Sequence, residues 1–240
     1  MKIPFYKPSI GPEEIAEVVD TLKSGWLTTG PKTKQFERDF AGYIGQKHAI
    51  AVNSCTAALH LALEAIGLKA GQGVIVPTMT FAATAEVVRY FGARPILVDC
   101  RRQDFNLDVA DAERKVSAAL AGGMQVVAII PVHYGGQIVD VAGVQALAKK
   151  YQLKIVEDAA HCCPAYYRTE NVPELGRATP CAPPMATEPP AGNGVSALPA
   201  SSFQPSTLNP QPSERWLPVG TGADISCFSF YANKTITTGE

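Results

Sequence analysis

A lysine near the end of the sequence has the chemistry to bind a carbonyl compound covalently. Lys234 lies in CFSFYANKTITTGE (227–240), and Ser229 precedes it in the same stretch. An amine held in a pocket that favours its neutral form attacks a carbonyl carbon to give a Schiff base, and a nearby hydroxyl can bind a phosphate. Most lysines are instead solvated, so Lys234 alone does not distinguish a nucleophile from a surface residue.

Two carboxylates and a histidine follow an apolar run in KIVEDAAH (154–161). Asp158 in this stretch could hold a protonated ring nitrogen, bind a metal ion or act as a base. It could equally cap a following helix, because aspartate is a common helix N-cap. Both alternatives stay open on this stretch alone.

A third stretch has the features of an anion site. In AVNSCTAALHLALEAIG (51–67), an apolar run leads through Asn53, Ser54 and Thr56 into a predicted helix. The free N–H groups and the positive dipole end of a helix N-terminus bind phosphate, and the hydroxyls add hydrogen bonds. The alternative is a simple helix cap, which is common at helix starts.

Together the three stretches supply what pyridoxal 5'-phosphate (PLP) requires. The anion site would anchor the phosphate, the carboxylate would keep the pyridine nitrogen protonated, and the lysine would hold the aldehyde. Phe81, in PTMTFAAT (77–84), adds a flat apolar face on which a ring could stack. The combination points to PLP more strongly than any one of its members.

The remaining pattern predicts the elements that position these residues. Ile15, Val18, Val19 and Leu22 recur at helical spacing and predict an amphipathic helix over 12–24. Strands are predicted at HAIAV (48–52), GVIVP (73–77), RPILVD (94–99), QVVAIIPV (125–132), LKIVED (153–158) and ADISCFSF (223–230), with helices at 54–67 and 140–151. Apolar strands that alternate with helices predict an α/β fold, with a mainly parallel sheet covered by helices on both faces. Ligands bind beyond the carboxyl ends of such strands, where the three stretches lie.

Composition excludes several classes of partner. The 240 residues carry a formal net charge of -1, so nothing suggests electrostatic capture of nucleic acid or of an anionic membrane. No stretch has the length of apolar sequence that a signal peptide or a membrane span needs, and we expect a soluble, cytoplasmic protein. The six cysteines have no paired C-x-x-C spacing, which argues against a zinc site or a disulfide framework, and we predict no bound metal.

One segment breaks the α/β pattern. Residues 173–218 hold 11 of the 19 prolines, together with many Ser, Ala, Thr and Gly residues. Such a composition has little to bury and lacks backbone donors, so we predict a disordered or polyproline-like insertion. The predicted organisation is a first part of a cofactor-binding domain at 1–172, the insertion at 173–218, and a strand with the lysine at 219–240.

Six motifs carry a resemblance to a known family. They are SGWLTTGPK (24–32), AVNSCTAALHLAL (51–63), VIVPTMTFAATAEVVRYFGARPILVD (74–99), IIPVHYGGQ (129–137), VEDAAH (156–161) and CFSFYANKTITTGE (227–240). In these motifs the sequence resembles the DegT-type nucleotide-sugar aminotransferases, which have the fold type I architecture of PLP enzymes. The resemblance covers nearly all of the chain outside the Pro-rich segment.

The resemblance implies a role for each matching position. Lys234 matches the Schiff-base lysine, Asp158 the partner of the pyridine nitrogen, Phe81 the stacking aromatic, and His161 a residue beside the cofactor ring. Phosphate-binding positions are matched by Ser54, Cys55, Thr56 and Ser229, with Cys55 acting through its backbone, and a loop that lines the active site is matched by Thr28, Thr29 and Gly30.

The implied reaction is transamination of a nucleotide-linked keto-deoxysugar, with glutamate as the amino donor and a homodimer as the assembly. Family members continue beyond TTGE with further strands and a small C-terminal domain, which we expect this chain to lack. The alternative is a non-catalytic remnant that at most binds PLP or a full-length partner. An NAD-binding domain is disfavoured because no G-x-G-x-x-G follows the early strands.

Overall fold

A parallel five-stranded sheet forms the centre of the protein. The computed structural model describes residues 4, 6–168 and 216–234. The strands are β1 (Gly73–Pro77), β2 (Arg94–Val98), β3 (Val126–Ile129), β4 (Lys154–Asp158) and β7 (Ile225–Cys227). They pair in the order β2-β1-β3-β4-β7, and every pairing is parallel. All five carboxyl ends therefore point to the same edge of the sheet.

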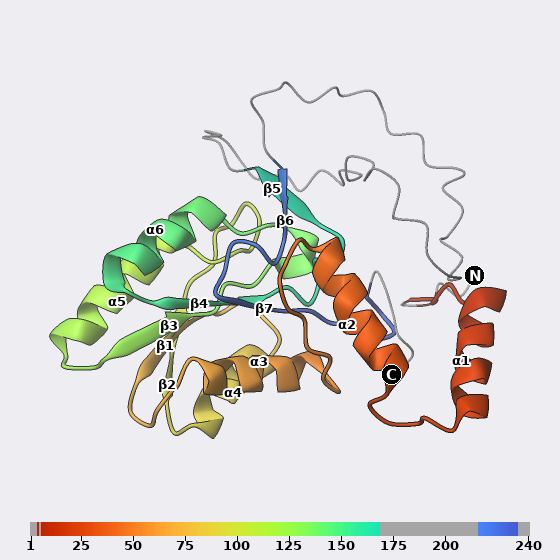
Figure 1. The fold of residues 1–240 in the computed structure, drawn as a ribbon. Helices are drawn as coiled ribbons and strands as arrows, with labels where there is room; N and C mark the ends of the chain where they lie inside the picture. Colours follow the sequence, from red (N-terminus) through yellow and green to blue (C-terminus); the bar gives the residue numbers. More distant parts are fainter. Residues whose placement is uncertain (1–3, 5, 169–215, 235–240) are drawn as a thin grey trace.

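Helices cover both faces of this sheet, as the sequence predicts (Figure 1). On one face lie α3 (Cys55–Ala65) and α4 (Ala83–Tyr90), and their buried side chains, such as Leu63 and Val87, pack against Val74 and Val156. On the other face lie α5 (Val109–Ala121) and α6 (Val141–Tyr151), which pack against Ile75, Ile129 and Ile155. Alternate strand residues thus supply two separate cores.

Two N-terminal helices lie beside the sheet. The first, α1 (Pro12–Ser24), has the predicted bounds, but none of its residues is buried and its apolar side chains Ile15, Val18, Val19 and Leu22 are exposed. The second, α2 (Pro31–Tyr43), packs its phenylalanines against the residues that follow β7. Lys32 joins the two helices through ion pairs of 2.6 and 2.8 Å with Glu17 and Asp20.

Short elements complete the described structure. A 3₁₀ turn, η1 (Tyr134–Gly136), follows β3, and β5 (Tyr166–Arg168) pairs antiparallel with β6 (Trp216–Pro218). The last three residues of the predicted Pro-rich insertion therefore belong to β6, and the predicted boundary at residue 218 is displaced. The rest of the segment 173–218 lies outside the described residues. No helix in the described ranges is long and apolar enough to cross a membrane.

The prediction of a strand at HAIAV (48–52) is wrong. These residues have no regular secondary structure and belong to no sheet, and the side chain of Ile50 is 81% exposed. The N–H of Ala51 donates to the Glu37 carboxylate at 3.0 Å instead of to a neighbouring strand. An apolar run becomes a strand only when another strand pairs with it, and no described segment does so here.

The two faces of α3 give a matched test of the core. Leu63 is fully buried, whereas Leu61 on the same helix is 53% exposed. We expect Leu63→Ala to lower the free energy of unfolding by about 2–5 kcal/mol, because it leaves a cavity. Leu61→Ala should change it by less than about 0.5 kcal/mol. Urea unfolding of both variants measures the difference, and equal losses would contradict the assigned core.

Candidate active site

The strand ends bring segments that are distant in sequence into contact. Backbone hydrogen bonds join the N–H of Ala159 to the carbonyl of Cys227 at 2.9 Å and the N–H of His133 to the carbonyl of Asp158 at 3.2 Å. The loops after β3, β4 and β7 therefore meet at one edge of the sheet. Such an edge is where parallel α/β sheets bind their ligands.

Asp158 ends β4 with a carboxylate that is buried but only partly satisfied. Its side chain accepts a hydrogen bond from the Thr84 hydroxyl at 2.9 Å on Oδ2 and one from the Ala160 N–H at 3.2 Å on Oδ1. An ionised carboxylate offers about four acceptor positions, and these two hydrogen bonds occupy two of them. Burial raises the pKa of Asp158, and the two hydrogen bonds only partly oppose it.

Glu157, the preceding residue, points to the other side of the strand and is fully paired. Its carboxylate accepts from Nε2 of His133 at 2.8 Å, from the Ser226 hydroxyl at 2.7 Å and from the Gly220 N–H at 3.0 Å. His133 Nδ1 accepts from the Val139 N–H at 3.2 Å, which leaves Nε2 as the ring nitrogen that donates to Glu157. Burial by itself raises the pKa of Glu157, but these donors outweigh it and hold the pKa below its usual value.

His161 follows β4, and its imidazole contacts the turn after β3. Its Nδ1 accepts from the Gly135 N–H at 3.2 Å, so a neutral ring carries its hydrogen on Nε2. Gly136 next to it has φ 84° and would place a Cβ 3.4 Å from the His161 carbonyl, so glycine suits this turn. Partial burial and the charge of Lys234 lower the pKa of His161, while Asp158 opposes them. The lysine and the carboxylate thus act electrostatically on one imidazole.

Ser54 caps α3, as the simpler interpretation of its sequence predicts. Its Oγ accepts from the Ala57 N–H at 3.1 Å, while Cys55 and Thr56 form the first turn of the helix. Because the hydroxyl only accepts in this bond, its hydrogen remains to be donated to an anion. The cap and an anion site are therefore compatible.

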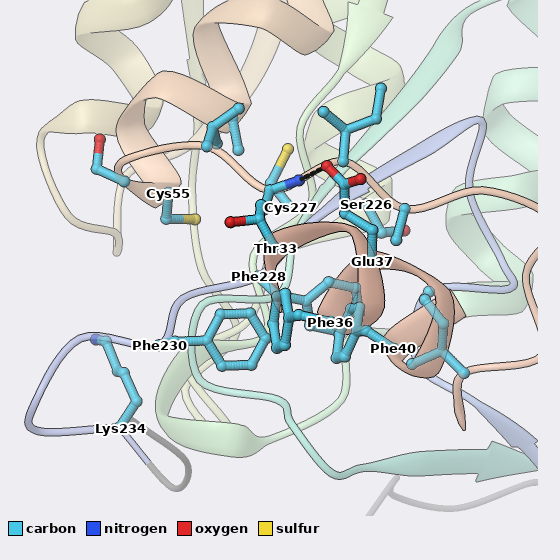
Figure 2. Close-up of a pocket in the computed structure, with 18 of the residues that line it drawn as sticks. Thr33, Phe36, Glu37, Phe40, Cys55, Ser226, Cys227, Phe228, Phe230 and Lys234 are labelled. Atoms are coloured by element: carbon cyan, nitrogen blue, oxygen red, sulfur yellow. Dashed lines mark hydrogen bonds between the residues drawn. The ribbon is translucent and has the colours of Figure 1, made fainter. Parts of the chain in front are cut away.

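An aromatic cluster holds the segment that leads to Lys234 (Figure 2). Phe40 packs edge-on against Phe228 and Phe230, with ring centroids 5.1 and 5.3 Å apart, and Phe36 meets Phe230 at 5.2 Å. Ser229, between the two phenylalanines, is buried, and its Oγ accepts from the Tyr231 N–H at 3.4 Å. The clustered rings on either side of Ser229 fix the course of the chain after β7.

Phe81 is placed differently from these packed rings. Its side chain is 77% exposed, although it follows β1 at the ligand-binding edge of the sheet. Its backbone carbonyl accepts from the Thr84 N–H at 3.1 Å, which fixes the start of α4. A ring face is therefore open for stacking against a planar ligand.

A groove of about 1850 Å³ borders this cluster. It runs between α1, α2, residues 48–52 and β7, and Ser54, Cys55 and Lys234 are among the residues that line it. Asp158, His161 and Phe81 lie outside it. The groove thus approaches the candidate site from the edge of the sheet, where β7 has no further neighbouring strand among the described residues.

Three of the predicted site residues are not joined to the strand-end cluster. Thr28, Thr29 and Gly30 form the connection between α1 and α2, and Gly30 is the N-cap of α2. No hydrogen bond or ion pair recorded for the described residues links them to Asp158, His161 or Lys234. Their assignment to an active-site loop stays a prediction.

Sequence reasoning missed the residues that support Asp158 and Glu157. Thr84 and His133 lie 74 and 24 positions away from their carboxylate partners in sequence, and both side chains are fully buried. The signal that was available is the placement of PTMTFAAT and HYGG just after two predicted strands. Strand-end placement marks a neighbourhood, but it does not say which side chain meets which.

Comparison with known proteins identifies the family to which this arrangement belongs. The family model described as DegT/DnrJ/EryC1/StrS aminotransferase matches residues 8–181 and 214–240. The chain belongs to this aminotransferase family. The spore coat polysaccharide biosynthesis protein SpsC of Bacillus subtilis is 43% identical over 177 residues, which are 74% of this chain and 44% of SpsC.

Solved structures of aminotransferases share the fold. Spr1654 from Streptococcus pneumoniae, assigned as a sugar aminotransferase and solved in its PMP form, matches with a TM-score of 0.74 and 29% identity over 99% of this chain and 50% of its own. DesV of S. venezuelae, in complex with a ketimine intermediate, matches with a TM-score of 0.60 and 35% identity over 64% of this chain and 40% of its own. The chain spans about half the length of the relatives that it matches.

The two adjacent carboxylates should have opposite effects on how the free energy of unfolding depends on pH. Because folding raises the pKa of Asp158, protonated Asp158 stabilises the fold below its usual value of 3.8, and that contribution is lost as pH rises. Because folding lowers the pKa of Glu157, its contribution is present above its usual value of 4.5 and is lost as pH falls. At pH 7, Asp158→Asn should therefore raise the free energy of unfolding of the cofactor-free chain. Glu157→Gln should lower it by about 1–3 kcal/mol.

Urea unfolding between about pH 4 and about pH 8 measures both differences. Each difference should shrink as pH falls toward the pKa of the carboxyl group concerned. A loss of stability in Asp158→Asn as large as that in Glu157→Gln would contradict the distinction between the two carboxylates.

Proposed function

We propose that this chain is the cofactor-binding part of a PLP-dependent sugar aminotransferase. The observation that carries the proposal is geometric: backbone hydrogen bonds bring the loops after β3, β4 and β7 together at one edge of the sheet, next to the buried carboxylate of Asp158. His161 lies on the loop after β4, and Lys234 follows β7 along the chain. A lysine and a buried carboxylate on neighbouring strand-end loops are the groups that PLP chemistry needs. The family membership and the resemblance to Spr1654 and DesV support it.

Each part of the site fits one part of PLP. The capped N-terminus of α3, with Ser54 and the backbone of Cys55 and Thr56, would bind the phosphate, together with Ser229. The remaining acceptor positions of Asp158 would take the N–H of a protonated pyridine ring, and the exposed ring of Phe81 would stack on it. Lys234 would bind the aldehyde carbon.

When bound, PLP would supply an electron sink that stabilises a carbanion next to nitrogen. The chain's own residues would hold and transfer protons around it. Asp158 would keep the ring nitrogen protonated, because an ionised carboxylate favours a cation beside it. Lys234 Nζ, once free, would carry a proton between the substrate carbon and the cofactor carbon. His161, with its hydrogen on Nε2, would donate a hydrogen bond at the ring.

The substrate proposal is a nucleotide-linked keto-deoxysugar, with glutamate as the amino donor. The relationship to SpsC, a polysaccharide biosynthesis protein, favours a carbohydrate acceptor. Thr28, Thr29 and Gly30 would contribute to the substrate side of the site. The proposal includes a homodimer, which the family resemblance implies, and a cytoplasmic location, which follows from the expectation stated for the sequence. The whole reaction belongs to proteins about twice as long, so PLP binding is the part of the activity that the described residues best support.

The test is a titration of the 240-residue chain with PLP. We expect a visible absorbance band that sodium borohydride removes, and a peptide that contains Lys234 should then carry the reduced pyridoxyl mass. Lys234→Ala should lose the band, because no amine is left to bind the aldehyde. Lys149→Ala is the matched control, since Lys149 is an exposed lysine in α6.

The outcomes separate the two interpretations of the chain. Formation of 2-oxoglutarate from added glutamate would show that the chain carries out the first half of transamination. A borohydride-sensitive band without 2-oxoglutarate would favour a binding protein that does not turn over. Absence of the band, or labelling of lysines other than Lys234, would refute the assigned site.

A further inference from the structure

A buried threonine stands behind the carboxylate at the centre of the site. Thr84 is the second residue of α4, and its side chain is 0% exposed. Its hydroxyl lies 2.9 Å from Oδ2 of Asp158. Nothing in the assigned roles of the site residues accounts for this contact.

The direction of the bond follows from the acceptor. An ionised carboxylate has no hydrogen to give, so Thr84 donates its only hydroxyl hydrogen to Asp158. The Thr80 hydroxyl lies 2.7 Å from the Thr84 hydroxyl and therefore donates to it. A directed chain of two hydrogen bonds runs from Thr80 through Thr84 to Asp158.

These two hydrogen bonds join two parts of the site that lie on different loops. Thr80 directly precedes Phe81, whose exposed ring is the proposed stacking surface. Asp158 ends β4, two strands away from β1 in the sheet. The hydroxyls thus link the loop that carries the aromatic ring to the carboxylate proposed to bind the ring nitrogen.

The bond also fixes the side-chain rotation of Asp158. The Ala160 N–H holds Oδ1 at 3.2 Å and Thr84 holds Oδ2, so each oxygen has one protein donor. Two anchors on opposite oxygens leave the carboxylate plane little freedom to turn. Hydrogen bonds to an ionised group are stronger than those between neutral groups.

We propose that Thr84 is a positioning residue that orients the Asp158 carboxylate toward the ring nitrogen of the bound cofactor. The inference rests on the proposed function, because it assumes that Asp158 meets the pyridine ring. It goes beyond that function in naming the group that holds the carboxylate. Thr84 itself need not touch the cofactor.

The first experiment compares Thr84→Val with Thr84→Ser by titrating each 240-residue variant with PLP. Valine keeps the shape of threonine but loses the hydroxyl, and we expect about tenfold weaker binding. Serine keeps the hydroxyl and should bind within about threefold of the parent chain. Equal affinity of parent and Thr84→Val would overturn the proposal.

The second experiment asks whether the effect passes through the ring nitrogen. In 1-deazapyridoxal phosphate a carbon atom replaces that nitrogen. The orientation of the Asp158 carboxylate therefore cannot strengthen binding of this analogue through the ring nitrogen. The Thr84→Val penalty should fall from about tenfold with PLP to about twofold or less with the analogue. A penalty of the same size with both ligands would mean that Thr84 only supports the fold, and would overturn the proposal.

Two further variants keep the test decisive. Thr80→Val removes the donor to Thr84 at a partly buried position, and should give a smaller loss that is again specific for PLP. It replaces Thr84→Val as the deciding variant if that protein does not fold.

Asp158→Asn should lose its preference for PLP over the analogue. If it keeps that preference, or if the parent chain binds no PLP, the proposed function fails and this inference fails with it. If only the threonine variants lack ligand selectivity, the inference alone fails.

Discussion

The pleat of β4 sets the chemistry of this protein by sending two adjacent carboxylates to opposite sides. Glu157 turns toward His133, Ser226 and Gly220, and its three donors make it a structural anion that ties the ends of β3, β4 and β7 together. Asp158 turns toward α4 and receives one donor on each oxygen. The same strand thus carries one carboxylate that stabilises the fold and one whose ionised form the fold disfavours.

The ionised form of Asp158, which the fold disfavours, points to a functional role for this residue. A buried carboxylate with a raised pKa is destabilising at neutral pH unless a cation joins it, and such carboxylates cluster at functional sites. The neighbouring network has the opposite character, because it is complete without any ligand. Glu157 and His133 keep the backbone of β4 in place, and Thr84 fixes the side chain that the backbone presents. Lys234 reaches the same region along a segment that is held by four phenylalanines from α2 and from the residues after β7.

The sheet could be largely predicted from sequence because burial is encoded locally, and the site residues stay a prediction. GVIVP (73–77) is apolar throughout and is β1 with the predicted bounds, since both faces of that strand are covered. HAIAV (48–52) has the same pattern, but a strand also requires a partner, which depends on the rest of the fold. The helix α2 was not predicted, because its apolar face consists mainly of Phe36 and Phe40, which pack against the rings of Phe230 and Phe228, far away in the sequence. The contact between Thr84 and Asp158 likewise depends on tertiary structure, and no local pattern contains it.

The proposed function requires an ion pair between Asp158 and the ring nitrogen of PLP, and nuclear magnetic resonance can observe that nitrogen directly. With ¹⁵N-labelled PLP bound to the 240-residue chain, the nitrogen should show the chemical shift of a protonated pyridine near pH 7. In Asp158→Asn the shift should move to that of a neutral pyridine. An unprotonated nitrogen in the parent chain, or the same shift in both proteins, would contradict the role assigned to Asp158.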